Sequence, residues 1–284
     1  MRTCDLHTHS IFSDGTDSPT KLINDAIELE LSAVALCDHN TVDGLPEFLS
    51  AAEGKNIEAV PGAEFSVEYN GVEMHLLGLF IPKIYFKLVN LWMKEAADAK
   101  LESNREMIAA LNQAGYKISF EAIQSATPKG NFNRAHVACA LLEHGYIASI
   151  DEAFETLLSP EGGFYKEPPR ISIWDMLKFL NEIDAVSVLA HPFLQLDEAQ
   201  VTQLLPLAKA HGLAGMECLY STYDAATTEC SFRLARQFDL KPSGGSDYHG
   251  IPKPDIALGK GRGNLEIPYE WVADLKKSAG EITR

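Results

Sequence analysis

Short apolar runs separated by amphipathic stretches make up most of the chain. The runs "TCDLHTH", "SAVALCDH", "IEAVPGAE" and "VEMHLLGLFI" come first, and "AVSVLAHP", "LAGMECLY" and "KPSGGSDYH" come later. Between them, apolar residues recur three or four positions apart, as at Leu22, Ile23 and Ala26, which is the spacing of one helix face. Ser18 and Pro19 precede that stretch and suit a helix N-cap and a first helical position. The alternation predicts an α/β fold.

The alternation stops between residues 88 and 165. Three amphipathic segments follow one another there: "LVNLWMKEAADAKLESNREMIAALNQAG", "RAHVACALLEHG" and "IDEAFETLLS". No clear strand pattern lies between them. We therefore predict a helical insertion domain at 99–165 that divides the α/β body into a first part, 1–98, and a second part, 166–284.

Composition narrows the range of functions. With 284 residues and 46% hydrophobic residues, the chain can bury a large core. A formal net charge of −16 disfavours binding to duplex nucleic acid but permits small anions or short single-stranded ends. No apolar run of about 18 residues predicts a membrane span, and "MRTCDLHTHS" lacks the apolar region of a signal peptide. Five cysteines without a C-x-x-C pair favour a reducing, cytoplasmic location.

Histidines and acids stand at or near the ends of the predicted strands. His7 and His9 are two positions apart, so both side chains point to one side of a strand, and Asp14 follows in the next loop. In a closed parallel barrel, the C-terminal strand ends meet on one face. Imidazoles and carboxylates without a thiolate suit Zn²⁺, Mn²⁺ or Fe²⁺ rather than a cysteine-rich structural zinc site. The candidate ligands are His7, His9, Asp14, His39, Glu64, His75, His191, Asp247 and His249.

Each of these motifs also has a simpler interpretation. An H-x-H pair arises by chance, and Asp38 can be a helix N-cap beside a surface His39. Glu64 can be a turn carboxylate, and His191 before a proline can be a core histidine. However, six of the nine histidines fall at or near strand ends among acids, and this joint pattern favours a metal site.

A second candidate site lies in the predicted insertion. Arg134 and His136 stand near the start of a helix, where a cation, an imidazole and backbone N–H groups can together bind a phosphate. The alternative is an ordinary solvated helix face.

The motifs "DLHTHS", "SDGT", "CDHNT", "PGAE", "LAHP" and "GGSDYHG" occur in this order between residues 5 and 250. Together they resemble the polymerase and histidinol phosphatase (PHP) family of metal-dependent phosphoesterases. The resemblance implies a distorted (β/α)7 barrel and two to three divalent ions, Mn²⁺ foremost, with Zn²⁺ or Fe²⁺ as alternatives. It assigns a first metal to His7, His9, Glu64 and Asp247, a second to Glu64, His75 and His191, and a third to Asp14, His39 and His249.

The helical insertion resembles that of the branch that removes the 3′-phosphate from nucleoside 3′,5′-bisphosphates and can trim short RNA from the 5′ end. That branch reads Arg-Pro-His where this chain has Arg134, Ala135 and His136. The resemblance adds Lys166, in "GGFYKEPP", as a further phosphate contact. Histidinol phosphatases of the family tend to carry His where this chain has Asp14, which argues against that substrate.

We therefore expect a phosphatase that acts on a small phosphorylated substrate, a nucleotide, and removes the 3′-phosphate of nucleoside 3′,5′-bisphosphates through a hydroxide shared by two metals. Asp38 is expected to orient an imidazole or a metal-bound water. The alternatives are a 5′–3′ exoribonuclease acting on short single-stranded RNA, and a phosphatase for histidinol phosphate or another small molecule. More distant alternatives are an amidohydrolase, in which a carboxylated lysine often bridges the metals, and a non-catalytic metal-stabilised module. Neither duplex nucleic acid nor a membrane is an expected partner.

Overall fold

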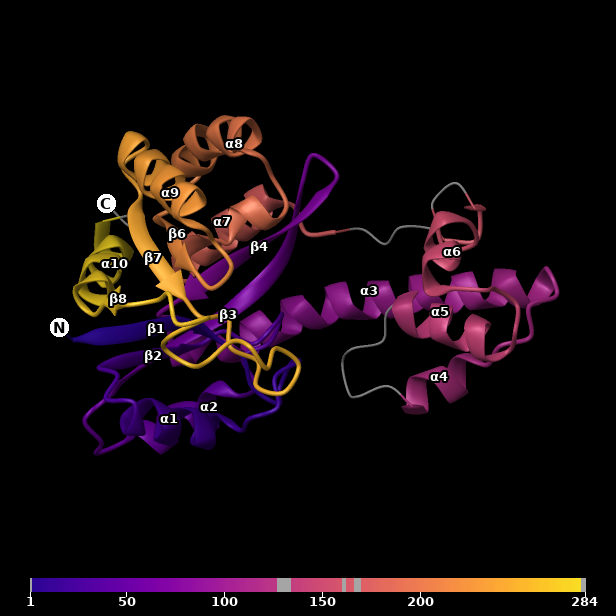
Figure 1. The fold of residues 1–284 in the computed structure, drawn as a ribbon, viewed down its shortest axis with the longest axis horizontal. Helices are drawn as coiled ribbons and strands as arrows, with labels where there is room; N and C mark the ends of the chain where they lie inside the picture. The colour runs from indigo at the N-terminus through magenta and orange to yellow at the C-terminus, as the bar shows by residue number, and fades with distance from the viewer. Residues whose placement is uncertain (1, 127–133, 160–161, 166–169, 282–284) are drawn as a thin grey trace. The chain divides into compact units, whose positions relative to one another are not determined.

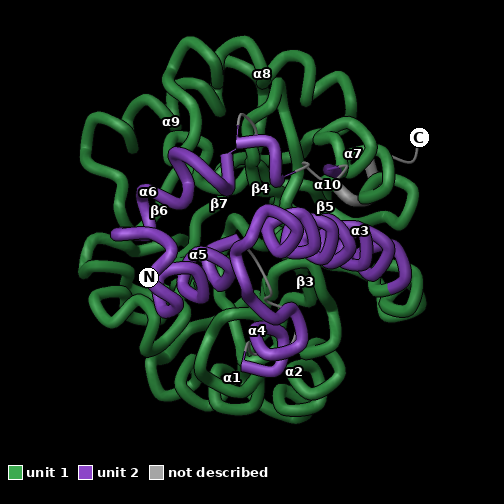
Figure 2. Tube along the Cα trace, turned by 90° about the vertical axis from the view of Figure 1, so that its right-hand side faces the viewer, with its two compact units in different colours: residues 1–90, 171–284 green, residues 91–170 purple. Residues whose placement is uncertain are grey.

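The chain forms two compact units. The computed structural model describes residues 2–126, 134–159, 162–165 and 170–281. Unit 1 comprises residues 1–90 and 171–284, and unit 2 comprises residues 91–170 (Figure 2). Unit 1 is thus built from two separate parts of the sequence.

The sheet of unit 1 has eight strands in the order β7-β6-β5-β4-β3-β2-β1-β8 and curls into a nearly closed barrel (Figure 1). This confirms the predicted α/β barrel of the PHP type. Neighbouring strands are parallel within β1-β2-β3 and within β5-β6-β7. The strands are β1 (Thr3–Thr8), β2 (Ala33–Leu36), β3 (Glu58–Tyr69), β4 (Val72–Leu79), β5 (Val186–Ala190), β6 (Gly215–Tyr220), β7 (Lys241–Gly245) and β8 (Ile267–Pro268).

Strands β4 and β8 depart from the parallel arrangement from which the meeting of the strand ends was argued. Strand β4 runs antiparallel to both β3 and β5, and β8 runs antiparallel to β1. The physical reason at β4 is the turn formed by Asn70 and Gly71, whose φ angles are 52° and 80°. Positive φ at both central residues is the geometry of the tight hairpin turn that Asn-Gly favours. His75 consequently lies in the first half of β4, opposite Ser66 and Ala190.

The seam between the first and last parallel strands closes at the candidate ligands. The Asp247 N–H donates to the His7 carbonyl at 2.8 Å, and the His9 N–H donates to the Tyr248 carbonyl at 2.9 Å. Gly245 permits this approach, because a Cβ there would lie only 2.2 Å from the His7 Cβ. The glycine is therefore needed for backbone contact across the seam.

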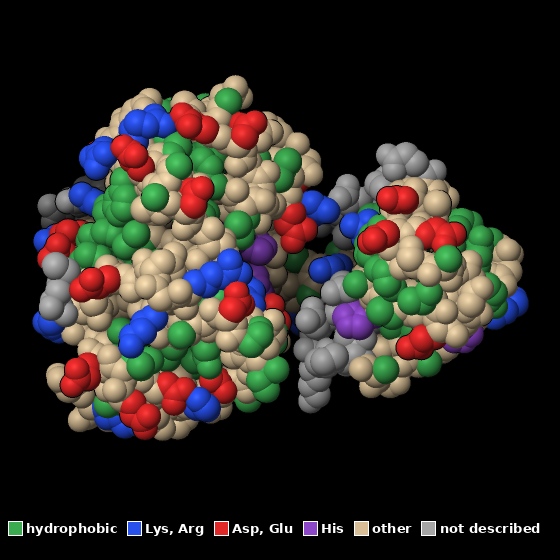
Figure 3. Space-filling view, viewed as in Figure 1, with side chains coloured by type: hydrophobic (Ala, Val, Ile, Leu, Met, Phe, Trp, Pro, Cys, Tyr) green, Lys and Arg blue, Asp and Glu red, His purple; other side chains and the backbone are tan. Residues whose placement is uncertain are grey.

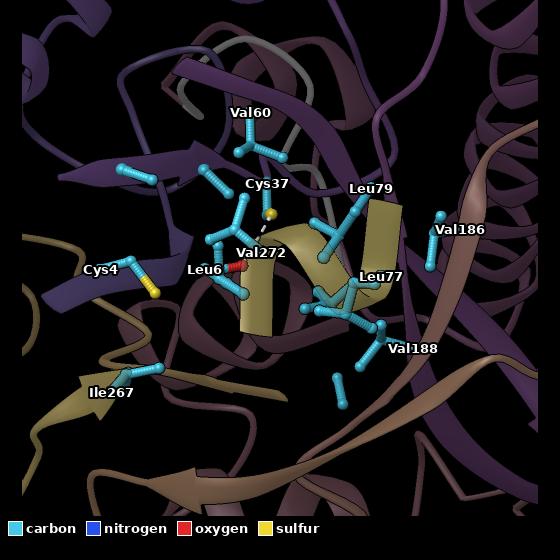
Figure 4. Close-up of a cluster of buried hydrophobic side chains, with 14 of the residues drawn as sticks. Cys4, Leu6, Cys37, Val60, Leu77, Leu79, Val186, Val188, Ile267 and Val272 are labelled. Carbon is cyan, nitrogen blue, oxygen red and sulfur yellow. Dashed lines mark hydrogen bonds between the residues drawn. The ribbon is translucent and has the colours of Figure 1, made fainter. Parts of the chain in front are cut away.

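Apolar side chains from the strands and from the last helix pack together inside the sheet (Figure 4). Cys4 and Cys37 belong to this cluster, and the Cys37 thiol lies 3.5 Å from the Leu6 carbonyl. Each fully buried large aliphatic side chain contributes roughly 1.5–3 kcal/mol relative to exposure. The cluster thus holds the strands together below the polar rim.

Helices lie outside this sheet (Figure 1). The predicted N-cap Ser18 is confirmed, since its hydroxyl accepts from the Lys21 N–H at 3.1 Å. Ser172, Asp197 and Asp224 cap later helices in the same way. The helices are α1 (Pro19–Glu28), α2 (Leu45–Ala52), α7 (Ile173–Glu182), α8 (Glu198–Ala210), α9 (Ala225–Gln237) and α10 (Glu270–Glu281), with short 3₁₀ segments η1 (Lys83–Tyr85) and η3 (Pro192–Leu194).

The described part of unit 2 contains helices and no strand. Helix α3 (Phe86–Gln113) begins in unit 1 and continues into unit 2, followed by α4 (Phe120–Ala126), α5 (Arg134–Glu143) and α6 (Ile150–Glu155). These helices bury a core of their own, which includes Met107, Leu111 and Val137. Across the described residues, none of the helices is both long and apolar enough to cross a bilayer.

Candidate metal centre

All nine candidate ligands lie in unit 1 and converge at one rim of the barrel. His9, His39, His191, Asp247 and His249 follow the ends of parallel strands, and His7 is the last residue but one of β1. The expectation that Glu64 ends its strand is wrong, because β3 continues to Tyr69 in the hairpin with β4. Glu64 nevertheless lies at the rim, because it pairs with His39, just beyond the end of β2.

The two carboxylate oxygens of Glu64 face different sets of imidazoles. Oε2 lies 3.1 Å from His7 Nε2 and 3.2 Å from His9 Nε2. Oε1 lies 2.8 Å from His75 Nδ1 and 2.9 Å from His191 Nε2. Asp247 joins the first set, with Oδ1 3.1 Å from His9 Nε2. One carboxylate can therefore bridge two adjacent cation positions.

A third set of donors surrounds Asp14. Its Oδ1 lies 3.2 Å from His249 Nε2, and its Oδ2 lies 3.8 Å from His39 Nε2. The side chains of Asp14 and His39 are 38% and 26% exposed, so this set is on the open side of the site. Histidine atoms are visible at the surface of unit 1 in Figure 3. Solvent, and therefore a small substrate, can approach from this side.

The chemistry of these donors fits divalent cations. Their separations of 2.8–3.8 Å match the roughly 3.3 Å between neighbouring ligand atoms around a tetrahedral ion with bonds of about 2.0–2.1 Å. Several of the buried donor atoms also lack a hydrogen-bond partner, a state that costs free energy unless something else binds them. The atoms are His7 Nε2, His9 Nδ1, His9 Nε2, Asp14 Oδ1, His75 Nδ1 and His191 Nδ1.

Two candidate ligands occupy strained backbone positions. His191 has φ 25° and Asp247 has φ 56°, in the left-handed region that non-glycine residues seldom adopt. The residue before a proline normally prefers extended backbone, so His191, which precedes Pro192, is doubly unusual. Such strain costs on the order of 1–3 kcal/mol per residue and concentrates at functional sites.

Glu217, in the middle of β6, is a residue that the sequence analysis missed. It is completely buried, and its Oε1 accepts from His7 Nδ1 at 3.0 Å. Its Oε2 accepts from the His191 backbone N–H at 2.7 Å. By holding the proton on His7 Nδ1, the carboxylate leaves Nε2 free to bind a cation. The signal was present in "GMECLY", where a carboxylate interrupts an otherwise apolar strand.

Two more buried carboxylates hold the loops of the rim. Asp5 accepts from the backbone N–H groups of Ser246 at 2.9 Å and of Gly259 at 2.8 Å, although burial raises its pKa. Asp38 accepts from the Ser10 N–H and from the Ser13 hydroxyl, each at 2.7 Å. Asp38 thereby fixes the loop that leads to Asp14. Its expected contact with an imidazole or a water stays a prediction.

The electrostatics of the rim depend on the balance between burial and neighbouring charge. Burial disfavours protonated His9, but the adjacent carboxylates of Asp247 and Glu64 outweigh it and raise the pKa of His9 to about 9. At His39 burial dominates and lowers the pKa to about 3. Burial opposes the charge on Glu64, yet the surrounding imidazoles hold its pKa well below the usual range. Glu64 therefore stays ionised at neutral pH.

The candidate phosphate contacts belong to unit 2, residues 91–170. Arg134 and His136 are in helix α5 of unit 2, where Arg134 donates to the Leu158 carbonyl at 3.1 Å. Its guanidinium also lies 4.1 Å from the centre of the Tyr165 ring. Lys166 lies outside the described residues. The roles of these three residues stay predictions.

A family model described as the PHP domain matches residues 5–183. The chain is 31% identical to a 5′-3′ exoribonuclease of Haemophilus influenzae over 93% of this chain and 94% of that protein. It is 28% identical to a 3′,5′-nucleoside bisphosphate phosphatase of Chromobacterium violaceum, over 88% of each chain.

Two solved structures share the fold. One, from Bifidobacterium adolescentis, is described as a metal-dependent phosphoesterase; it has a TM-score of 0.73, 25% identity, and coverage of 98% of this chain and 96% of that one. The other is an amidohydrolase from Chromobacterium violaceum with bound sulfate, with a TM-score of 0.74, 25% identity, and coverage of 97% and 96%.

Proposed function

This chain belongs to the PHP family and is a metal-dependent phosphoric ester hydrolase, and from that premise we propose that it removes the 3′-phosphate from nucleoside 3′,5′-bisphosphates. The main observation in favour of phosphatase chemistry is that the two carboxylate oxygens of Glu64 face different sets of imidazoles. The choice of substrate is supported by the bisphosphate phosphatase relative and by Arg134 and His136 at the start of α5.

Two to three divalent ions, with Mn²⁺ as the first choice and Zn²⁺ or Fe²⁺ as alternatives, would lower the pKa of water and neutralise charge on the phosphoryl oxygens. His7, His9, Glu64 and Asp247 would hold the first ion, and Glu64, His75 and His191 the second. Asp14, His39 and His249 would hold a third at the open side.

The protein itself orients the imidazoles that would bind the ions. His249 Nδ1–H donates a hydrogen bond of 2.8 Å to the Asp247 carbonyl, which leaves Nε2 facing Asp14. Glu217 does the same for His7. Buried partners thus set the tautomers of two imidazoles before any ligand arrives. Arg134 would bind the phosphate that is not cleaved, so that binding energy positions the reacting group.

A 5′-3′ exoribonuclease activity on short RNA is the second candidate. The Haemophilus relative with that name matches along 93% of this chain. The two activities can share a site, because each hydrolyses a phosphoester at a 3′ position of a nucleotide that bears a 5′-phosphate. The two activities are therefore distinguished by the preferred substrate, which is a single nucleotide for the phosphatase and a short RNA for the exoribonuclease.

An amidohydrolase activity is a weaker candidate, although one solved neighbour has that name. The group placed between the two imidazole sets is Glu64, whereas the carboxylated lysine expected for many amidohydrolases would occupy that position. Assays with amides and lactones beside phosphomonoesters test this alternative.

The deciding experiment is a hydrolysis screen with Mn²⁺, Zn²⁺, Mg²⁺ and Fe²⁺, which measures inorganic phosphate released from the monoesters and nucleoside monophosphates released from RNA. The substrates are nucleoside monophosphates, nucleoside 3′,5′-bisphosphates, histidinol phosphate and short 5′-phosphorylated RNA, and Asp247→Asn serves as the inactive control. The proposal requires the highest kcat/KM on the bisphosphate. A higher value on RNA favours the exoribonuclease, and no release from any nucleotide contradicts both.

A further inference from the structure

Asp247 is bound on both sides of its carboxylate. Oδ1 faces His9 Nε2 at 3.1 Å, within the first donor set. Oδ2 accepts from the Tyr220 hydroxyl at 2.7 Å and from the Lys253 ammonium at 2.7 Å. Lys253 therefore stands one carboxylate away from the candidate metal centre, and both belong to unit 1.

The backbone around Lys253 is held in place. Its N–H donates to the Gly250 carbonyl at 3.1 Å, and its carbonyl accepts from the Ile256 N–H at 3.0 Å. Pro252 and Pro254 flank it and restrict the chain on either side. A lysine on an ordered backbone loses less conformational entropy on binding than one on a free loop.

The side chain of Lys253 is 35% exposed, whereas that of Asp247 is 5% exposed. The ammonium thus lies at the boundary between the buried donors and solvent. It has three donors, of which one suffices for Asp247. Cations on Oδ1 of Asp247 would weaken the hold of that carboxylate on the ammonium and favour a new anionic partner.

We propose that Lys253 binds a non-bridging oxygen of the substrate phosphate, and of the phosphate product, at the rim beside Asp247. This inference deepens the proposed function and rests on it only for the presence of a phosphate ester, whichever nucleotide carries it. Lys253 would add a positive charge from the protein to the charge supplied by the cations.

Binding of inorganic phosphate tests the inference without any substrate. The measurement is isothermal titration of phosphate into metal-loaded protein, together with metal content by mass spectrometry. Lys253→Met should weaken phosphate binding about tenfold or more and keep the wild-type metal content, and Lys253→Arg should recover part of the affinity. Lys260→Met is the matched control, since Lys260 is an exposed lysine of the same segment that lies near Thr3 and Leu31, at the opposite end of β1.

Tyr220→Phe separates phosphate binding from simple support of Asp247, because it removes an uncharged partner of the same oxygen. If Lys253→Met and Tyr220→Phe lower metal content alike and neither changes the phosphate affinity of fully loaded protein, Lys253 only positions Asp247 and the inference is overturned. Wild-type phosphate affinity in Lys253→Met overturns it as well. If Lys253→Met weakens phosphate binding but no nucleotide is hydrolysed, the inference stands and the proposed substrate fails.

Discussion

Replacing Glu217 by glutamine tests whether this buried carboxylate sets the tautomer of His7 before a metal binds. The carboxylate accepts two hydrogen bonds, from His7 Nδ1 and from the His191 backbone N–H. A glutamine has one accepting oxygen and one donating amide. The backbone N–H of His191 can only donate, so the oxygen must face it and the amide must face His7. His7 would then carry its proton on Nε2, the atom that faces Glu64 and Asp247.

The expected cost follows from this change of tautomer. Loss of a carboxylate that orients a ligating histidine lowers metal affinity about 10–100-fold, or about 1.4–2.7 kcal/mol. The shape of the side chain is unchanged, so the folded core should persist. Competition titration with a chelator measures the affinity, and ¹⁵N chemical shifts of the imidazoles report the His7 tautomer.

The matched control is Glu58→Gln. Glu58 begins β3, the strand that carries Glu64, but accepts from the Tyr269 hydroxyl and from Lys276 instead. This variant should retain wild-type metal affinity. If Glu217→Gln also retains it, or if His7 keeps its proton on Nδ1, Glu217 does not set the tautomer of His7.

Three further predictions concern charge. His9→Ala and Asp247→Asn should each lower turnover by orders of magnitude together with metal content, because both residues contribute to the first donor set; normal metal content in both would remove them from it. Arg134→Ala should raise KM for substrates with two phosphates and spare monophosphates, and unchanged kinetics on both would refute its role. In metal-free protein, folding raises the pKa of His9 from 6.5 to about 9. Its contribution of up to about 3 kcal/mol to the free energy of unfolding is therefore complete below pH 6.5 and lost as pH rises to 9. Denaturant titrations across that range should show the loss only without metal, and a flat profile would contradict the assigned charge.

The hydrophobic pattern was sufficient to predict an α/β fold and the helical segments, because strand and helix periods differ and the caps are local. Ser18 is an example, since its hydroxyl caps α1 as expected. The barrel itself was implied by the resemblance to the PHP family. The direction of β4 was missed because direction depends on one turn. Asn70 and Gly71 carried that information in the sequence, and the alternation of apolar residues in β4 did not.

The convergence of residues distant in sequence was predictable at the strand ends, because a barrel brings those ends to one rim. The side chains that hold these ligands in place were not predictable from the sequence. Glu217 and Lys253 act through contacts with His7 and Asp247 that only the folded chain creates. Arg134 and His136 belong to unit 2, and sequence spacing does not determine their distance from the rim.

Anomalous diffraction from crystals grown with Mn²⁺ shows whether Glu64 lies between two cations. We predict peaks on both sides of the Glu64 carboxylate, one among His7, His9 and Asp247 and one between His75 and His191, with a third beside Asp14 where three ions bind. Absence of a peak at either Glu64 oxygen, in crystals that bind Mn²⁺ elsewhere, would contradict this prediction.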